Sequence, residues 1–168
     1  MLDHFEIRKV LALYCHACDR CDPELLASVY TGTDSFDDHG IIRASGPEYA
    51  RQITTMIQKT TTAMSHTLGQ SIIQLNGNEA KAETFFIALM IAQGDDGTPR
   101  LSQLAGRFID ELRKIDEHWK VHRRQAVHDL SATLKIEEDF LATNLLSRGC
   151  RDSSDPGAAL LGLAHAKR

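Results

Sequence analysis

Two polar residues of this chain, Asp19 and His66, have the types needed for acid–base chemistry. A carboxylate that holds an imidazole fixes its tautomer and makes the far ring nitrogen a better base near neutral pH. Tyr14 lies five positions before Asp19, so on a helix the two side chains point to neighbouring faces and can border one cavity. Taken alone, each residue also has an ordinary interpretation: Asp19 as a helix-end residue in water, and His66 as a strand-edge histidine bound to the backbone.

Other polar residues are candidates for contact with a substrate. His39 could face the mouth of a cavity or lie in a solvated turn. His128 could enter the pocket or pair with its neighbour at the end of a strand. Arg124 could bind an anionic or oxygen-rich substrate, or form an ion pair with Asp110 or Glu111.

The aromatic residues Phe85, Phe108 and Trp119 are typical core residues, and we expect one or two of them to line the pocket. The spacing of Cys15, Cys18 and Cys21 resembles that of metal ligands, but no second Cys/His pair with zinc-type spacing follows them. We therefore interpret these cysteines as small buried hydrophobic residues and expect no metal.

Periodicity divides the chain into a helical half and a strand half. Apolar residues at three- and four-residue steps predict a helix over 3–19, and Asp22-Pro23-Glu24 predicts the start of a second. Turn signals and residue patterns predict a short strand at 34–43 that turns at His39-Gly40, and a helix from Gly46-Pro47 to about residue 60. They also predict strands at 65–75, 79–93, 101–115 and 118–130, with hairpin turns at Asn76-Gly77-Asn78 and Asp116-Glu117. This segregation favours an α+β fold with helices on one face of a curved antiparallel sheet, around a concave apolar cavity.

Length and composition favour a single domain. The chain has 168 residues, and we expect a domain at 1–143 and a C-terminal tail at 144–168, which is a possible lid or partner-binding extension. The net charge of −4 and the absence of a basic stretch argue against a nucleic-acid partner. No apolar run is long enough for a membrane span and the N-terminus is unlike a signal peptide, so the expected location is the cytoplasm.

Several segments resemble the SnoaL-like branch of the NTF2-like superfamily, over about residues 5–130. Their order and spacing carry the resemblance, and they are Val10-Leu11-Ala12-Leu13-Tyr14, Asp19-Arg20-Cys21-Asp22, Tyr30 through Asp38-His39-Gly40, His66-Thr67-Leu68-Gly69-Gln70, Ala80-Lys81-Ala82-Glu83-Thr84-Phe85, Gly106-Arg107-Phe108-Ile109-Asp110 and Trp119-Lys120-Val121-His122-Arg123-Arg124. The resemblance implies a cone-shaped α+β barrel formed by a curved antiparallel sheet and three N-terminal helices.

The resemblance also implies a type of chemistry. Scytalone dehydratase, the lindane dehydrochlorinase and the bile-acid dehydratases have an Asp and a His at the places of Asp19 and His66, and the last group has a Tyr at the place of Tyr14. These enzymes use no metal or organic cofactor and catalyse eliminations, and similar diarylpropane lyases release formaldehyde. By this resemblance His66 abstracts a proton, Asp19 orients it, and Tyr14 donates a hydrogen bond to developing negative charge.

The expected function is therefore that of a cofactor-independent lyase in aromatic compound catabolism, acting on a small aromatic or alicyclic molecule. Two alternatives remain open: an isomerase that uses the same pair, and a binding or assembly module without turnover. A homo-oligomer, either a dimer or a trimer, is expected because the outer face of such a sheet is usually covered by another subunit.

Overall fold

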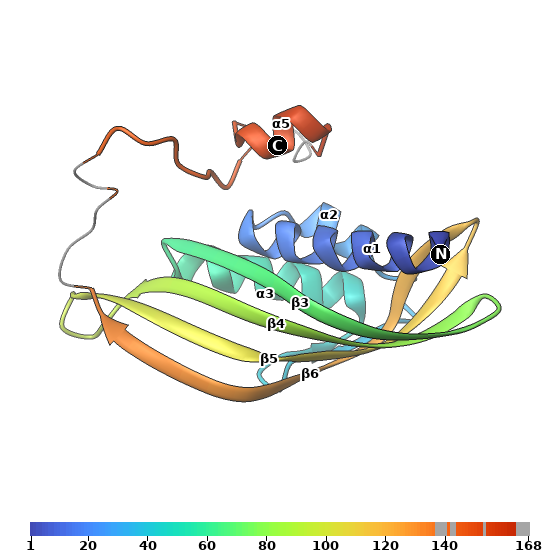
Figure 1. Cartoon of the computed structure of the whole chain (residues 1–168). Coiled ribbons are helices and arrows are strands. Elements are labelled where there is room, and N and C mark those ends of the chain that lie inside the picture. Colours follow the sequence, from blue (N-terminus) through green and yellow to red (C-terminus); the bar gives the residue numbers. More distant parts are fainter. Residues whose placement is uncertain (137–140, 142–143, 153, 164–168) are drawn as a thin grey trace.

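The computed structural model describes residues 1–136, 141, 144–152 and 154–163. A layer of three helices covers one face of a six-stranded sheet (Figure 1). The helices of this layer are α1 (Leu2–Asp19), α2 (Pro23–Ser28) and α3 (Gly46–Thr60). The strands are β1 (Phe36–Asp38), β2 (Arg43–Ala44), β3 (Ala63–Asn76), β4 (Glu79–Gln93), β5 (Pro99–Ile115) and β6 (His118–Lys135), and a short helix α5 (Pro156–Leu161) lies near the C-terminus. The α+β class and the helices on one face are confirmed.

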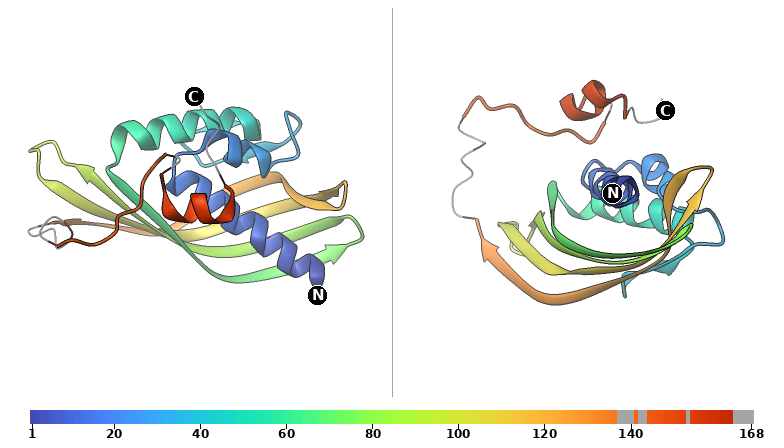
Figure 2. Two further views of the ribbon diagram at one scale, coloured as in Figure 1. Left: turned by 90° about the horizontal axis from the view of Figure 1, so that it is seen from above. Right: turned by 45° about the vertical axis from the view of Figure 1, so that its right-hand side comes forward.

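The sheet has the order β2-β1-β6-β5-β4-β3, so β2 and β3 are its edges and the sheet is not closed into a complete barrel. All neighbouring strands are antiparallel except β1 and β6. Register shifts interrupt the β3–β4 pairing between Leu68 and Ser71, and the β5–β6 pairing beside Gly106 and Leu112. Such bulges increase twist and bend a strand, and the sheet accordingly curls around the helices (Figure 2, right).

The core fills the space between the helices and the concave face. On β4 the even-numbered positions are buried from Ala80 to Ala88, which follows from the two-residue period of a strand. From α1, side chains such as Ile7, Leu11 and Tyr14 pack against this face. The predicted cap of α2 is confirmed, because the Asp22 carboxylate accepts hydrogen bonds from the backbone N–H groups of Glu24 and Leu25.

The largest difference from the predicted strands is in the last one. The expected strand at 34–43 turns at His39-Gly40 as predicted and forms β1 and β2, because Gly40 has φ of 76° and the His39 N–H bonds to the Ile42 carbonyl. The last strand continues to Lys135 and pairs there with the beginning of β5, although both of its faces are exposed in this part. The predicted strand ended at residue 130 because residues 131–135 have no buried face that would identify them as a strand.

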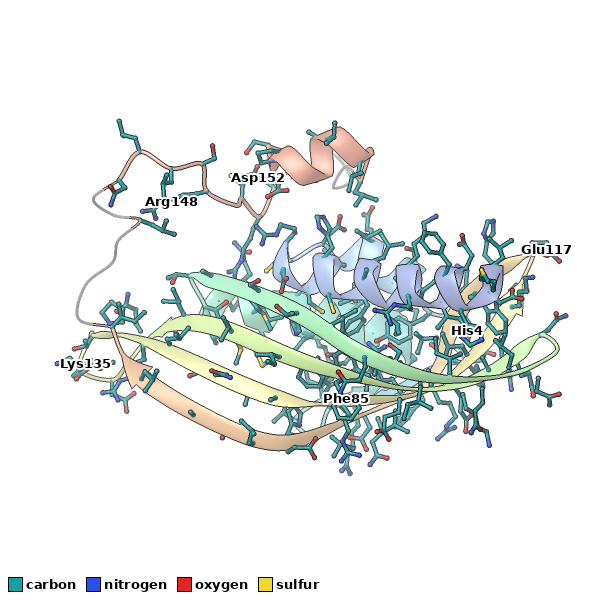
Figure 3. The ribbon with its side chains drawn as sticks, viewed as in Figure 1. His4, Phe85, Glu117, Lys135, Arg148 and Asp152 are labelled. Atoms are coloured by element: carbon teal, nitrogen blue, oxygen red, sulfur yellow. The ribbon has the colours of Figure 1, made fainter. Side chains whose placement is uncertain are left out.

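Part of the C-terminal tail is attached to the helical layer (Figures 1 and 3). Arg20 Nη1 donates to the Cys150 carbonyl at 3.3 Å and to Asp155 Oδ2 at 3.4 Å. Arg151 Nη1 donates to the Thr61 carbonyl, just beyond α3, at 2.6 Å. The expected tail includes residue 153 and residues 164–168, which lie outside the described residues. Its possible role as a lid remains a prediction.

Among the described residues, no helix combines the length and apolar character that a membrane crossing requires.

Candidate active site

The Asp19–His66 pair forms in the structure. Asp19 is the last residue of α1, which stops there as the chain turns through Cys21 with φ of 54°. Its Oδ1 lies 2.7 Å from Nδ1 of His66, and its Oδ2 accepts the backbone N–H of the same residue at 2.9 Å. Both side chains are largely buried, with 11% and 7% of their surface exposed. Because the carboxylate holds Nδ1, the opposite nitrogen Nε2 is available to act as a base.

Tyr14 is placed in a different hydrogen-bonded group. Its hydroxyl lies 3.1 Å from Nε2 of His39 and 3.0 Å from the hydroxyl of Tyr49. Nδ1 of His39 lies 2.5 Å from Oδ1 of Asp37, and the Tyr30 hydroxyl donates to Oδ2 of Asp37 at 2.5 Å. We call these five residues the Asp37 cluster. The structure therefore joins Tyr14 to His39, and not to His66, through hydrogen bonds.

The tyrosines of the Asp37 cluster are neutral at physiological pH. Burial raises the pKa of Tyr14, Tyr30 and Tyr49 well above the usual value, and the Asp37 charge raises it further. Each hydroxyl therefore keeps its proton and can serve only as a hydrogen-bond donor or acceptor. Tyr14 is also 1% exposed, so a substrate would have to displace a neighbour to reach its hydroxyl.

Two stacked phenylalanines connect the histidines. The rings of Phe86 and Phe108 lie 4.3 Å apart at 14°, and we call them the Phe86–Phe108 floor. The His66 ring lies 6.3 Å from Phe86, the His39 ring 5.9 Å from Phe108, and the His128 ring 6.0 Å from Phe86. The residues predicted at 39, 66, 108 and 128 thus meet around one apolar surface.

His128 differs from the other two histidines because it is exposed. Burial of part of its ring lowers its pKa, His39 lowers it further, and Asp129 opposes the shift. His128 is therefore neutral at physiological pH and presents a hydrogen-bonding ring at the edge of the floor.

Phe85, predicted to contact substrate, lies on the other face of the sheet (Figure 3). Its neighbour Phe86 is on the concave face and occupies the place expected for Phe85. The strand alternates buried and less buried positions through this region, so the two faces are clear in the structure.

Arg124 forms the ion pair with Asp110 that the sequence left as an alternative to substrate binding. Nε and Nη2 donate to the two carboxylate oxygens at 2.7 and 2.8 Å, and neither side chain is exposed. The guanidinium lies 4.1 Å from the ring centroids of both Tyr14 and Phe108. Its Nη1 is buried without a hydrogen-bond partner among the described residues. Arg124 therefore packs against the faces of the Tyr14 and Phe108 rings.

The residues that the sequence analysis missed are Asp37, Tyr49, Tyr30 and Phe86. Asp37 and His39 are two positions apart, so a strand places them on one face, and this spacing was a usable signal.

Other features do not coincide with the histidines. A groove of about 560 Å³ opens on the outer face of the sheet, where exposed charged residues such as Lys81, Glu111 and Arg123 line it.

Burial raises the pKa of the Cys15 thiol to about 12 and that of Cys18 well above its usual value, so neither is a thiolate at neutral pH. Within the described part of the chain, no group of three or more His, Cys, Asp or Glu side chains is arranged to hold a metal ion.

Comparison with known proteins establishes the family, because the sequence profile of the SnoaL-like domain matches residues 1–125. The chain belongs to the SnoaL-like domain family. None of the curated proteins matches this SnoaL-like chain significantly in sequence.

Solved structures share its fold. A proposed scytalone dehydratase from Novosphingobium aromaticivorans is 20% identical with a TM-score of 0.69, over 78% of this chain and 87% of the other. The hexachlorocyclohexane dehydrochlorinase LinA type 2 is 15% identical with a TM-score of 0.69, over 79% and 89% of the two chains. An NTF2-like protein from Salmonella enterica is 20% identical with a TM-score of 0.64, over 73% and 88%. These similarities confirm an NTF2-like fold for this SnoaL-like chain.

Proposed function

We propose that this protein is a cofactor-independent lyase in which His66, oriented by Asp19, removes a proton from a small aromatic or alicyclic substrate. A small group then leaves, either water or, by retro-aldol-like cleavage, formaldehyde. The observation that carries the proposal is the double hydrogen bond between the Asp19 carboxylate and His66 at the edge of the Phe86–Phe108 floor.

The geometry suits a base for two reasons. The carboxylate binds the ring nitrogen and the backbone N–H of one residue, so the imidazole is fixed before a substrate arrives. Positive charge that develops on the ring during proton transfer is then stabilised by a carboxylate at 2.7 Å with little access to water. A positioned base of this kind contributes about 10²–10⁴-fold to a rate.

The apolar surroundings of His66 favour a flat apolar substrate. Phe86 is 5% and Phe108 1% exposed, and Arg124 and Phe86 cover the Phe108 ring, so a substrate ring would pack against the small exposed part of Phe86. Such packing would hold the acidic C–H or O–H group beside His66 while the polar end of the substrate faces His39 and His128.

The two structural relatives support a reaction of this class. The name of one describes removal of water and that of the other describes removal of hydrogen chloride. Both reactions require a base that takes a proton while another bond breaks. At this level of identity the relatives do not indicate a substrate for the present chain.

The homo-oligomer remains a prediction. A second copy would pack on the outer face of the sheet, where Ile87, Leu89, Leu130 and Leu134 are exposed apolar side chains. Ile87 pairs with Ala105 of β5, and Ala105 pairs with Leu130 of β6, so the side chains of Ile87 and Leu130 lie on the same face of the sheet.

The proposal is tested first with 5-nitrobenzisoxazole, whose ring opens to a coloured phenolate when a base removes one proton. We expect His66→Gln to reduce this rate by about 10²–10⁴-fold, because glutamine keeps the hydrogen-bonding size but is not a base. His118→Gln, at an exposed position in the β5–β6 hairpin, is the matched control and should retain the full rate. Near wild-type turnover by His66→Gln would show that this histidine is not the base.

A second step separates the lyase from the alternatives. A panel of aryl-substituted β-hydroxy ketones and 1,3-diols is incubated with the protein and analysed for alkene, formaldehyde or rearranged products by mass spectrometry. Release of water or formaldehyde supports the lyase. A product of unchanged mass with a shifted double bond indicates an isomerase, and binding without any product indicates a binding module.

A further inference from the structure

A second carboxylate–imidazole pair, Asp37–His39, lies across the Phe86–Phe108 floor from His66. We propose that this pair is a second acid–base centre, which gives a proton to the oxygen that leaves the substrate while His66 takes the proton from carbon. The inference rests on the proposed lyase function and assigns the acid that an elimination of water requires.

The Asp37 carboxylate is arranged to stabilise a protonated ring. It is completely buried, it contacts Nδ1 of His39 at 2.5 Å, and the Tyr30 hydroxyl donates to its other oxygen. Two donors directed at one buried carboxylate hold it in place against Nδ1 of His39. The pair is therefore a fixed hydrogen-bonded unit beside an apolar surface.

Nε2 is the nitrogen from which the proton would leave. It faces the hydroxyl of Tyr14 at 3.1 Å, and that hydroxyl is also bonded to Tyr49. When the ring is protonated, Nε2–H donates to the neutral phenol oxygen. An oxygen that carries developing negative charge is a stronger acceptor than a phenol, so it can replace Tyr14 as the acceptor. Tyr14 is then a positioning residue for His39.

The His39 ring is also held in place by packing. It stacks on Tyr49 with 4.8 Å between centroids, and it lies beside Phe108. Its side chain keeps 13% of its surface exposed, whereas Asp37 has none. His39 is thus the more accessible member of the pair.

The reaction balances with these two groups alone. His66 takes a proton from carbon, and the electron pair of that C–H bond forms the new C=C bond. The C–O bond breaks, and its electron pair accepts the proton from Nε2 of His39 to give water. His66 ends protonated and His39 neutral, and exchange with solvent restores both for the next turnover.

Groups from several elements face His39 and influence its proton. Tyr14 comes from α1, Tyr49 from α3, Asp37 from β1 and His128 from β6. Beneath Tyr14 lies the Arg124 guanidinium, whose charge is matched by Asp110. A selective loss of activity must therefore be assigned by substitution at His39 itself.

The test uses leaving groups that differ in their need for a proton. The two probes are 4-phenoxybutan-2-one and 4-(4-nitrophenoxy)butan-2-one, which share the acidic C–H and the carbonyl group. Nitrophenolate is a stable anion and leaves without protonation, whereas phenolate leaves slowly unless an acid protonates it.

We expect His39→Gln to reduce kcat/KM for the phenoxy probe by about 10²-fold or more, and for the nitrophenoxy probe by less than about 5-fold. Asp37→Asn should show the same selective loss, and His118→Gln should show none. Circular dichroism and the urea midpoint of each variant establish that it is folded.

Equal losses of His39→Gln on the two probes, or no loss on either, would overturn the assignment of the acid while the lyase proposal stands. If His66→Gln retains activity on both probes, or if the wild type turns over neither, the base and the acid fail together. His66→Gln should lose activity equally on both probes, since both reactions need the base.

Discussion

Substitution of Asp110 by asparagine tests whether the buried ion pair with Arg124 holds the core together. The two residues are direct partners in the β5–β6 pairing, and both side chains are completely buried. Burial alone would lower the pKa of Arg124, but the Asp110 charge and hydrogen bonds more than reverse this effect. Asp110→Asn removes the compensating charge and leaves a buried cation, which costs about 3–5 kcal/mol.

The same two strands carry a matched control. Arg107 binds Asp129 through Nε and Nη2, both at 2.9 Å, so its bidentate geometry is nearly that of the buried pair. Arg107 and Asp129 are 30% and 44% exposed, however, and water screens exposed pairs so that they contribute little to stability. Asp129→Asn should therefore be nearly neutral, and burial is the main difference between the two variants.

Urea unfolding measures both effects through the fluorescence of Trp119, the single tryptophan, which is 2% exposed. With a slope of about 2 kcal/mol per molar urea, Asp110→Asn should lower the midpoint by about 1.5–2.5 M. Asp129→Asn should lower it by less than about 0.5 M. The double variant Asp110→Leu/Arg124→Met should recover most of the loss, because no buried charge remains. Similar midpoints for the two single variants would refute the reasoning from burial.

Two further predictions concern the tail and the bend of the sheet. Asp155→Ala should remove about 1 kcal/mol of local stability, because the carboxylate caps α5, and faster amide exchange and proteolysis at 148–163 would show it. Hydrogen bonds from backbone N–H groups, above all that of Cys150, and the charge of Arg20 lower the pKa of Asp155 in the folded protein. The stability that the Asp155 carboxylate contributes is therefore present above about pH 4 and is lost as the pH falls through the lowered pKa. Gly106→Ala should lower the urea midpoint strongly, because its Cβ would lie 2.0 Å from the Val127 carbonyl oxygen, whereas Gly69→Ala, with 3.4 Å to its nearest neighbour, should change it little.

The architecture was accessible from the sequence because its signals are local. Periodicity identified the helices, and the turn signals at Asn76-Gly77-Asn78 and Asp116-Glu117 identified the two long hairpins. The meeting of Asp19 with His66 came from the family resemblance, since nothing in the residues themselves brings positions 47 apart together.

The details of the site depended on which face each side chain occupies. In the run Thr84-Phe85-Phe86-Ile87 apolar residues occupy both faces, so polarity could not show whether Phe85 or Phe86 points inward. The turn at His39-Gly40 was predicted, but the sequence did not show that it brings His39 to the Tyr14 hydroxyl, because this contact joins residues 25 positions apart.

Each of the two acid–base pairs depends on a hydrogen bond between α1 and the sheet or its connections, and this has a consequence for how activity is gained during folding. Asp19 reaches His66 from α1 to β3, and Tyr14 reaches His39 from α1 to the end of β1. The hairpins β3–β4 and β5–β6 join neighbours in sequence, whereas these polar contacts close loops of many residues and form at a greater cost in chain entropy. A refolding chain could therefore regain its strand signal before its first turnover. The delay between circular dichroism and catalysis after dilution from urea would measure the time that α1 needs to dock.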